Sequence, residues 1–215
     1  TPLANIRMYE EILREENQDA ETREKFLAKM QTQSEKLEWI LNSLFKMVKL
    51  EQNVMVFEVS MCPIRKTILD AVNLVYEKAA RKQILIKTGY IPDLLLYHNA
   101  KWTSEVFVNL LENACKAIDP EKGEIQLIVS CCSGTTHWEV VDNGIGINPE
   151  ILQRMWTHGY SESGSTGLGL SFVQQVVDLH HGTIEVKSSP GEYTRITITL
   201  PQNKGEHNGK EHFIN

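Results

Sequence analysis

The chain has 215 residues, 41% of them hydrophobic, which is enough for one domain with an appendage or for two small domains and excludes a wholly disordered protein. Its 22 basic and 28 acidic residues give a formal net charge of −6, and it shows neither a signal peptide nor an apolar run of the roughly 20 residues that span a membrane. We therefore expect this fragment to be cytoplasmic and to bind neither nucleic acid nor a membrane.

The first 50 residues predict two helices. They contain no Gly and a single Pro, Pro2, and helix-forming residues dominate. Residues 16–19 compete with a helix for backbone hydrogen bonds and predict a turn. Beyond that turn, seven residues recur at alternating spacings of three and four, the pattern of a helical bundle: Leu27, Met30, Ser34, Leu37, Leu41, Leu44 and Val48. A hairpin over 1–52 alone has a small core, so we expect it to dimerise as a four-helix bundle; the alternative is a hairpin packed on the rest of the protein.

A mixed domain is predicted over 53–202, followed by a polar tail over 203–215, so the fold class is α+β. Strands are predicted over 54–59, 84–87, 94–97, 124–132, 136–142, 183–187 and 193–200. Helices are predicted over 63–82, 101–119 and 168–180.

The predicted helix over 101–119 has two different sides. Its apolar residues share one side: Trp102, Val106, Leu110, Ala114 and Ile118. Another side carries Asn109, Asn113 and Lys116. Two amide groups and an ammonium group in one line suit a hydrated Mg²⁺ ion and the phosphates that it neutralises. A solvated helix face would have the same composition, so this side alone does not define a site.

Two glycine-rich segments follow. The strand over 136–142 ends at Asp142, and Gly144 and Gly146 come directly after it. A carboxylate at a strand end can accept a hydrogen bond from the exocyclic amine of adenine, and glycines let a flat ligand approach closely. The second segment leads into the helix at 168 and offers free N–H groups for an anion: Gly164, Thr166, Gly167, Leu168 and Gly169. Either segment alone could be a tight turn, and neither matches a P-loop or a dinucleotide-binding motif.

Three segments together resemble a known family. NLLENACKA (109–117), DNGIG (142–146) and GSTGLGL (164–170) resemble, in order and spacing, the N, G1 and G2 boxes of sensor histidine kinases. The residues from Thr1 resemble the end of the family's H box, and residues 180–201 resemble its closing strands. The resemblance implies a dimerisation and phosphoacceptor hairpin followed by an ATP-binding catalytic domain, an α/β sandwich of the Bergerat type.

The resemblance also implies roles for single residues. Asn113 would be the Mg²⁺ ligand, Asn109 and Lys116 its neighbours on the phosphate side, and Asp142 the residue that recognises adenine. The two glycines after Asp142 would shape the purine slot, and Thr197 in the last strand would support it. Residues 147–166 would form a lid over ATP. In the second glycine-rich segment, Gly167 and Gly169 would hinge this lid and hold phosphate.

The implied activity is phosphotransfer from ATP to a histidine and then to an aspartate on the receiver domain of a response regulator. In the resembling family, the acceptor histidine stands four residues before the Thr-Pro with which this chain begins. We therefore expect that this fragment does not phosphorylate itself and that a sensor region or membrane anchor can lie upstream. Thr1 matches a position that helps to place water when the regulator is dephosphorylated.

Two alternatives remain. Type II topoisomerases, mismatch-repair ATPases and ninety-kilodalton heat-shock chaperones share the nucleotide fold, but they usually carry a Glu as base four residues before the metal-binding Asn. Here that residue is Asn109, and an amide cannot take a proton. A regulatory module with a decayed ATP site is the other alternative, although the complete set of ligands argues against it. Replacing Asp142 by Asn is expected to weaken nucleotide binding with little change in the unliganded thermal midpoint.

Overall fold

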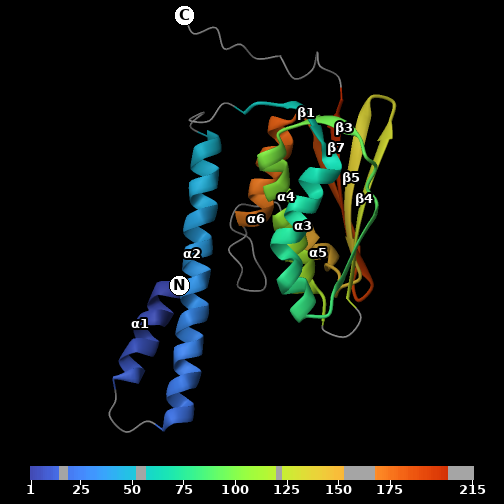
Figure 1. The fold of residues 1–215 in the computed structure, drawn as a ribbon. Helices are drawn as coiled ribbons and strands as arrows, with labels where there is room; N and C mark the ends of the chain where they lie inside the picture. Colours follow the sequence, from blue (N-terminus) through green and yellow to red (C-terminus); the bar gives the residue numbers. More distant parts are fainter. Residues whose placement is uncertain (15–18, 52–56, 120–122, 153–167, 203–215) are drawn as a thin grey trace, which may run out of the picture. The chain divides into compact units, whose positions relative to one another are not determined.

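The computed structural model describes residues 1–14, 19–51, 57–119, 123–152 and 168–202. The chain forms two compact units, Thr1–Met55 and Val56–Asn215 (Figure 1). The boundary lies three residues beyond the predicted one, and the predicted tail lies outside the described residues.

The first unit is a pair of helices, α1 (Pro2–Leu13) and α2 (Ala20–Glu51), as predicted. Thr1 begins α1, because its hydroxyl accepts a hydrogen bond from the backbone of the first turn at 3.4 Å. Asp19 begins α2 in the same way, because its carboxylate accepts the N–H and the hydroxyl of Thr22 at 2.7 and 3.0 Å. Each helix therefore starts at a side chain that satisfies its free N–H groups.

The predicted apolar seam of α2 is only partly covered within one chain. The rings of Tyr9 and Phe26 join the two helices with centroids 5.8 Å apart. Four residues of the seam are each 42–50% exposed: Leu27, Leu41, Leu44 and Val48. An apolar stripe of this length that remains open in the single chain is what a bundle of two copies requires.

The second unit contains a five-stranded sheet of order β2–β4–β5–β7–β6. Its strands are β2 (Leu85–Tyr90), β4 (Glu124–Cys132), β5 (Thr135–Asp142), β6 (Thr183–Ser189) and β7 (Tyr193–Pro201). β2 runs parallel to β4, and the other pairs are antiparallel. Ser133 and Gly134 join β4 to β5 with φ values of 50° and 79°, the geometry of a tight hairpin turn. The mixed sheet confirms the predicted α+β class.

Helices cover one face of this sheet (Figure 1). They are α3 (Ile64–Arg81), α4 (Ala100–Ala117) and α6 (Leu168–Leu179). A short helix, α5 (Pro149–Leu152), lies between β5 and α6 in the sequence. The apolar side predicted for the helix over 101–119 is confirmed, because its five residues are at most 4% exposed. Phe107 of α4 contacts Trp138 of β5 with ring centroids 5.8 Å apart, which fixes α4 on the sheet.

A second, two-stranded sheet pairs β1 (Ser60–Pro63) with β3 (Leu95–His98). The side chain of Gln202, just after β7, joins this small sheet to the large one. Its Oε1 accepts the N–H of Tyr97 at 2.7 Å, and its Nε2 donates to the carbonyl of Tyr97 at 3.4 Å. The side-chain amide thus takes the place of a backbone amide in a third strand.

The strand predicted over 54–59 is wrong where it can be compared. Residues 57–59 have no regular structure, the strand begins at Ser60, and residues 52–56 lie outside the described part of the chain. The physical reason is a competing partner, since the carbonyl of Glu58 accepts a hydrogen bond from the side chain of Asn99 at 2.8 Å rather than from a neighbouring strand.

Candidate functional site

The polar residues of α4 form the first part of the site. Asn109, Asn113 and Lys116 follow one another along the helix, and both asparagines are half-buried. The Nδ2 of Asn109 donates to the carbonyl of Glu105 at 2.8 Å. Because this bond uses the nitrogen end of the amide, it leaves Oδ1 available for a cation or for a water molecule bound to one.

Charged side chains from α3 and α4 set the electrostatics beside these amides. Lys78 Nζ lies 3.0 Å from Glu112 Oε1. Lys116 is exposed overall, but the protein around its ammonium group desolvates it and lowers its pKa; Glu112 opposes this shift and Lys78 adds to it. Lys82 Nζ donates to the carbonyl of Cys115 at 2.8 Å and so holds the last turn of α4. Glu112 therefore interacts with both Lys78 and Lys116, which makes it a poor general base.

Asp142, at the end of β5, forms the second part of the site. Its side chain is buried, and the residue is only 6% exposed. Burial raises the pKa of Asp142 to about 6, while the N–H of Gly144, which donates to its Oδ1 at 3.0 Å, opposes the shift. A buried carboxylate with spare acceptor capacity is costly for the empty protein and favourable for a ligand that brings an N–H donor.

The loop after Asp142 is fastened through the backbone N–H and carbonyl of Ile145. The N–H of Ile145 donates to the carbonyl of Ala117, the last residue of α4, at 2.9 Å. The N–H of Gly191, in the turn between β6 and β7, donates to the carbonyl of Ile145 at 2.7 Å. The loop thereby connects the end of α4 with the turn at the sheet edge, and the two parts of the site share one rigid support.

Two glycines in this loop have no room for a side chain. A Cβ on Gly144 would lie 2.6 Å from the carbonyl oxygen of Ala117. A Cβ on Gly146 would lie 2.1 Å from the carbonyl oxygen of Ser189, and Gly146 also has a φ of +66°. The predicted need for glycine is thus explained by close approach to the backbone of neighbouring elements.

The start of α6 is the third part that the sequence predicts. Leu168 is the first residue of this helix, and Gly169 is buried in its first turn. Three other predicted residues, Gly164, Thr166 and Gly167, lie outside the described residues, as does most of the predicted lid. Of the lid, the structure describes a loop that continues into α5, where Asn148 Oδ1 accepts the N–H of Glu150 at 3.0 Å.

Comparisons with known proteins identify the family of this domain. Residues 98–204 match the model of the family described as histidine kinase-, DNA gyrase B-, and HSP90-like ATPases. Sporulation kinase B of Bacillus subtilis (strain 168) is 32% identical over 130 residues, which is 60% of this chain and 30% of that protein. The chain carries an ATP-binding catalytic domain of the sensor histidine kinase type.

Solved structures show the same fold. The histidine kinase AdeS of Acinetobacter baumannii superimposes with a TM-score of 0.70 at 16% identity, over 95% of this chain and 96% of that one. The full-length ShkA, solved in complex with AMPPNP, gives a TM-score of 0.68 at 20% identity, over 94% of this chain and 46% of that one. Among the described helices, none combines the length and hydrophobicity needed to cross a membrane.

The structure of the kinase domain does not place Thr197 with the other predicted residues. Thr197 pairs with Glu139 and Glu185 and points to the sheet face away from the helices. Thr194 precedes Thr197 in the same strand and lies on its other face. It pairs with Asp142 and is 5% exposed. The alternation of buried residues in β7 indicates that Thr194 faces the core, but it does not indicate which residue of β5 lies opposite. Thr1 caps α1 in the other unit, and its predicted role stays a prediction.

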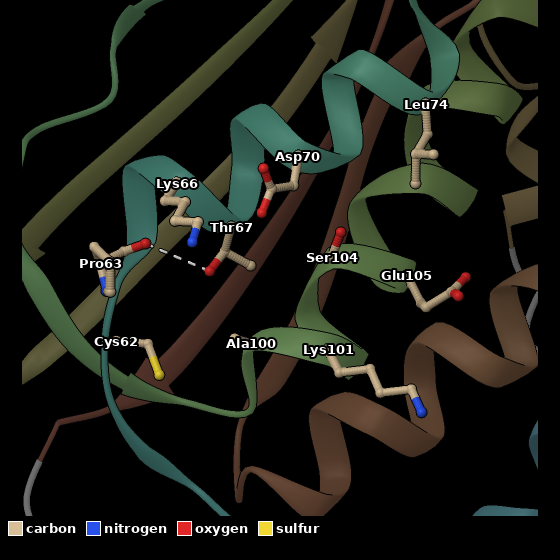
Figure 2. A pocket seen from close by; sticks show the side chains of 10 residues that line it. All are labelled: Cys62, Pro63, Lys66, Thr67, Asp70, Leu74, Ala100, Lys101, Ser104 and Glu105. Atoms are coloured by element: carbon tan, nitrogen blue, oxygen red, sulfur yellow. Dashed lines mark hydrogen bonds between the residues drawn. The ribbon is translucent and has the colours of Figure 1, made fainter.

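A separate cavity of about 480 Å³ lies between the first turns of α3 and α4 (Figure 2). Lys66, Thr67 and Asp70 line it from α3, and Ser104 and Glu105 line it from α4 (Figure 2). None of the predicted site residues lines this cavity. It is therefore distinct from the group of predicted site residues.

Proposed function

We propose that the chain is the catalytic core of a sensor histidine kinase that binds ATP with Mg²⁺ and transfers the γ-phosphate to a histidine. One observation carries this proposal: the asparagine side of α4 and the loop after Asp142 are joined by the hydrogen bond between Ile145 and Ala117. Adenine and phosphates lie at opposite ends of ATP, so a site that holds both needs two recognition parts at a fixed separation.

The roles follow from the chemistry of each group. Asp142 accepts the adenine amine, with Thr194 beside it on the neighbouring strand. Asn113 and Asn109 offer amide oxygens toward the phosphates, and Lys116 offers a positive charge. The backbone N–H groups at the start of α6, at Gly169, would add a binding position for an anion.

The donor set fits Mg²⁺ better than a metal that needs a protein cage. The described residues contain no group of three or more His, Cys, Asp or Glu side chains that could hold a metal ion. Mg²⁺ keeps several water molecules and is commonly held by one or two protein oxygens together with substrate phosphates. Asn113 would supply such an oxygen, and the ion would neutralise charge on the phosphates.

Transfer is favoured over hydrolysis by what surrounds Asn113. Phosphoryl transfer depends mainly on positioning and charge neutralisation, whereas hydrolysis needs a group that activates water. Asn109 cannot take a proton, and Glu112 is engaged by Lys78 at 3.0 Å. Glu112 also lies roughly 100° around the helix from Asn113. A superfamily ATPase or a regulatory module without kinase activity is the alternative.

The partners belong to the same proposal. The open seam of α2, with Leu27, Leu41, Leu44 and Val48 about half exposed, supports a homodimer through the helical hairpin. A histidine supplied from an upstream segment would accept the phosphate, and the receiver domain of a response regulator would take it over, with Thr1 beside the acceptor. The chain spans only 30% of the length of sporulation kinase B, so the sensed signal belongs to other parts of such a protein.

Replacing Asn113 by Ala tests the metal role. We expect ATP affinity in the presence of Mg²⁺ to fall at least about tenfold, the usual cost of a lost hydrogen bond to a charged group. Affinity with excess chelator should change little, because the lost oxygen acts through the ion. Isothermal titration of the 215-residue chain measures both values, and Asn73→Ala, an exposed asparagine on α3, is the matched control.

Full-length protein incubated with γ-labelled ATP then tests transfer. Acid-labile, base-stable label on the wild type, and none on the Asn113→Ala variant, would support the kinase. Tight ATP binding accompanied by rapid release of free phosphate would instead support the ATPase alternative, and binding without either product would support a regulatory module.

Replacing Glu112 by Gln tests the charge on Lys116. Glu112 raises the pKa of Lys116, so its loss lowers that pKa further, and the lysine loses its charge at a lower pH. We expect ATP affinity to fall roughly two- to fivefold, the range of a partly exposed ion pair, with a larger deficit as the pH rises. Glu77→Gln, which removes an exposed partner of Arg81, is the control in the same titrations. An equal and pH-independent effect in both variants would contradict the assignment.

A further inference from the structure

Asn99, the residue between β3 and α4, makes hydrogen bonds to three different parts of its unit. Its Oδ1 accepts the N–H of Trp102 at 3.0 Å and so caps α4. Its Nδ2 donates to the carbonyl of Glu58 at 2.8 Å, and its backbone N–H donates to Nε2 of His180 at 2.9 Å. One residue thus joins the start of α4, the segment 57–59 and the end of α6.

His180, directly after α6, completes the connection. It is 1% exposed, and its Nδ1 lies 2.8 Å from the carbonyl of Val176. Because Nε2 accepts a hydrogen bond from Asn99, Nδ1 must carry the proton that goes to Val176, and one neutral tautomer satisfies both contacts. The ring of Phe57 packs edge-on against His180, with centroids 4.7 Å apart and planes at 81°.

These contacts lie at the ends of α4 and α6 that are remote from the nucleotide residues. Asn99 precedes α4, whereas Asn109 and Asn113 lie in its second half. His180 follows α6, whereas Gly169 lies in its first turn. The rings of Trp102 and Phe172 join the two helices with centroids 5.9 Å apart. Two rigid helices therefore run from the contacts at Asn99 to the nucleotide residues.

We propose that Asn99 and His180 are positioning residues that couple the segment 57–59 energetically to ATP binding. This segment is the first described part of the ATP-binding unit after residues 52–56, which connect it to the hairpin. A displacement of Phe57 or Glu58 acts on the start of α4 and on the end of α6 together. Because coupling between two sites is reciprocal, ATP at the other ends of these helices must hold the segment more firmly. The inference rests on the proposed ATP binding.

Asn99→Asp separates coupling from capping. A carboxylate keeps the acceptor for Trp102 and is favourable at a helix N-terminus, and the backbone N–H still reaches His180. The variant loses only the donor to Glu58 and places a negative oxygen against that carbonyl. Phe57→Ala removes the ring contact from the other partner. Met61→Ala, at an exposed position of β1, is the control.

Two measurements on the 215-residue chain test the coupling: ATP·Mg²⁺ affinity by titration, and amide hydrogen exchange of residues 57–60 with and without nucleotide. We expect nucleotide to slow exchange in the wild type. Asn99→Asp and Phe57→Ala should each weaken ATP binding about fivefold or more, the lower end of allosteric coupling, and abolish the effect on exchange. The double variant should bind about as weakly as the weaker single variant, because both changes break one connection.

The outcomes are distinct. Variants that lower the thermal midpoint but bind ATP like the wild type would show a purely structural contact and overturn the coupling. Additive losses in the double variant, or the same loss in Met61→Ala, would also overturn it. A wild-type chain that binds no ATP at all would overturn the proposed function itself, before any variant is compared.

Discussion

Replacing Asp142 by Asn is expected to remove most of the affinity for ATP and to stabilise the unliganded protein at neutral pH. The Asn side chain can keep the hydrogen bond that Gly144 donates to Asp142 Oδ1 at 3.0 Å in the wild type. Its other terminal atom, however, is a nitrogen that donates and would face the N–H donor of adenine. The loss of a charged acceptor corresponds to about 1.5–3 kcal/mol, or roughly 10- to 150-fold in affinity.

The gain in stability follows from the pKa of Asp142, which burial raises from 3.8 to about 6. Between these two values the folded protein binds more protons than the unfolded chain, so the wild type loses stability as the pH rises through this window. Above pH 6 the folded protein holds a buried charge at a cost on the order of 2–3 kcal/mol. Asn carries no such cost.

Thermal unfolding of both proteins from pH 4 to pH 8, without nucleotide, measures this difference. The gain in stability of the variant over the wild type should be small at pH 4, increase up to about pH 6 and then stay constant. Asp119→Asn, at an exposed position, is the control and should show no such gain. A collapse of the variant at every pH would mean that Asp142 holds the fold together. The sequence alone predicted an unchanged midpoint, because burial of Asp142 depends on contacts that it does not reveal.

Replacing Gly146 by Ala is expected to destabilise the protein more than any other single change discussed. An added Cβ would meet the carbonyl oxygen of Ser189 at 2.1 Å, and a φ of +66° is unfavourable for any residue with a side chain. The nearest atoms all belong to the backbone of Ser189 and Pro190, so no flexible side chain can move aside. We expect a loss of about 3 kcal/mol or more, with a thermal midpoint lower by roughly 10 °C.

Gly191 provides the matched control. It has a similar φ of +78°, but a Cβ there would meet nothing within 4 Å. Gly191→Ala should therefore report the conformational cost alone, on the order of 1 kcal/mol. Calorimetry of the two variants separates the clash from the backbone cost. Equal midpoints for both would show that the loop moves away from Ser189 at little cost, and the rigid connection to α4 would then be wrong.

Features that depend on neighbours along the chain were predictable from the sequence. The apolar side of α4 is set by helical periodicity, and all five predicted residues are buried. The hairpin turn at Ser133 and Gly134 is set by local turn chemistry. Asp142 and the glycines after it could be found because a strand end, a carboxylate and two glycines occur in one short segment.

Features that depend on pairing across the chain were not predictable. The carbonyl of Glu58 accepts a hydrogen bond from Asn99, 41 residues away. Residues 57–59 therefore form no strand, although their apolar pattern favours one. Thr194 rather than Thr197 faces Asp142 because of the register between β5 and β7, which local pattern does not fix. The four-residue α5 is too short for periodicity to reveal.

The amide of Gln202 has a consequence for how this unit can be reused. It binds the backbone of Tyr97, and Tyr97 pairs with Met61 in the small sheet. The first strand of the unit, β1, and the residue that follows its last strand, Gln202, therefore both bind to the same short strand, β3. A folded body whose two connections are neighbours can be grafted between other modules with little disturbance to either side.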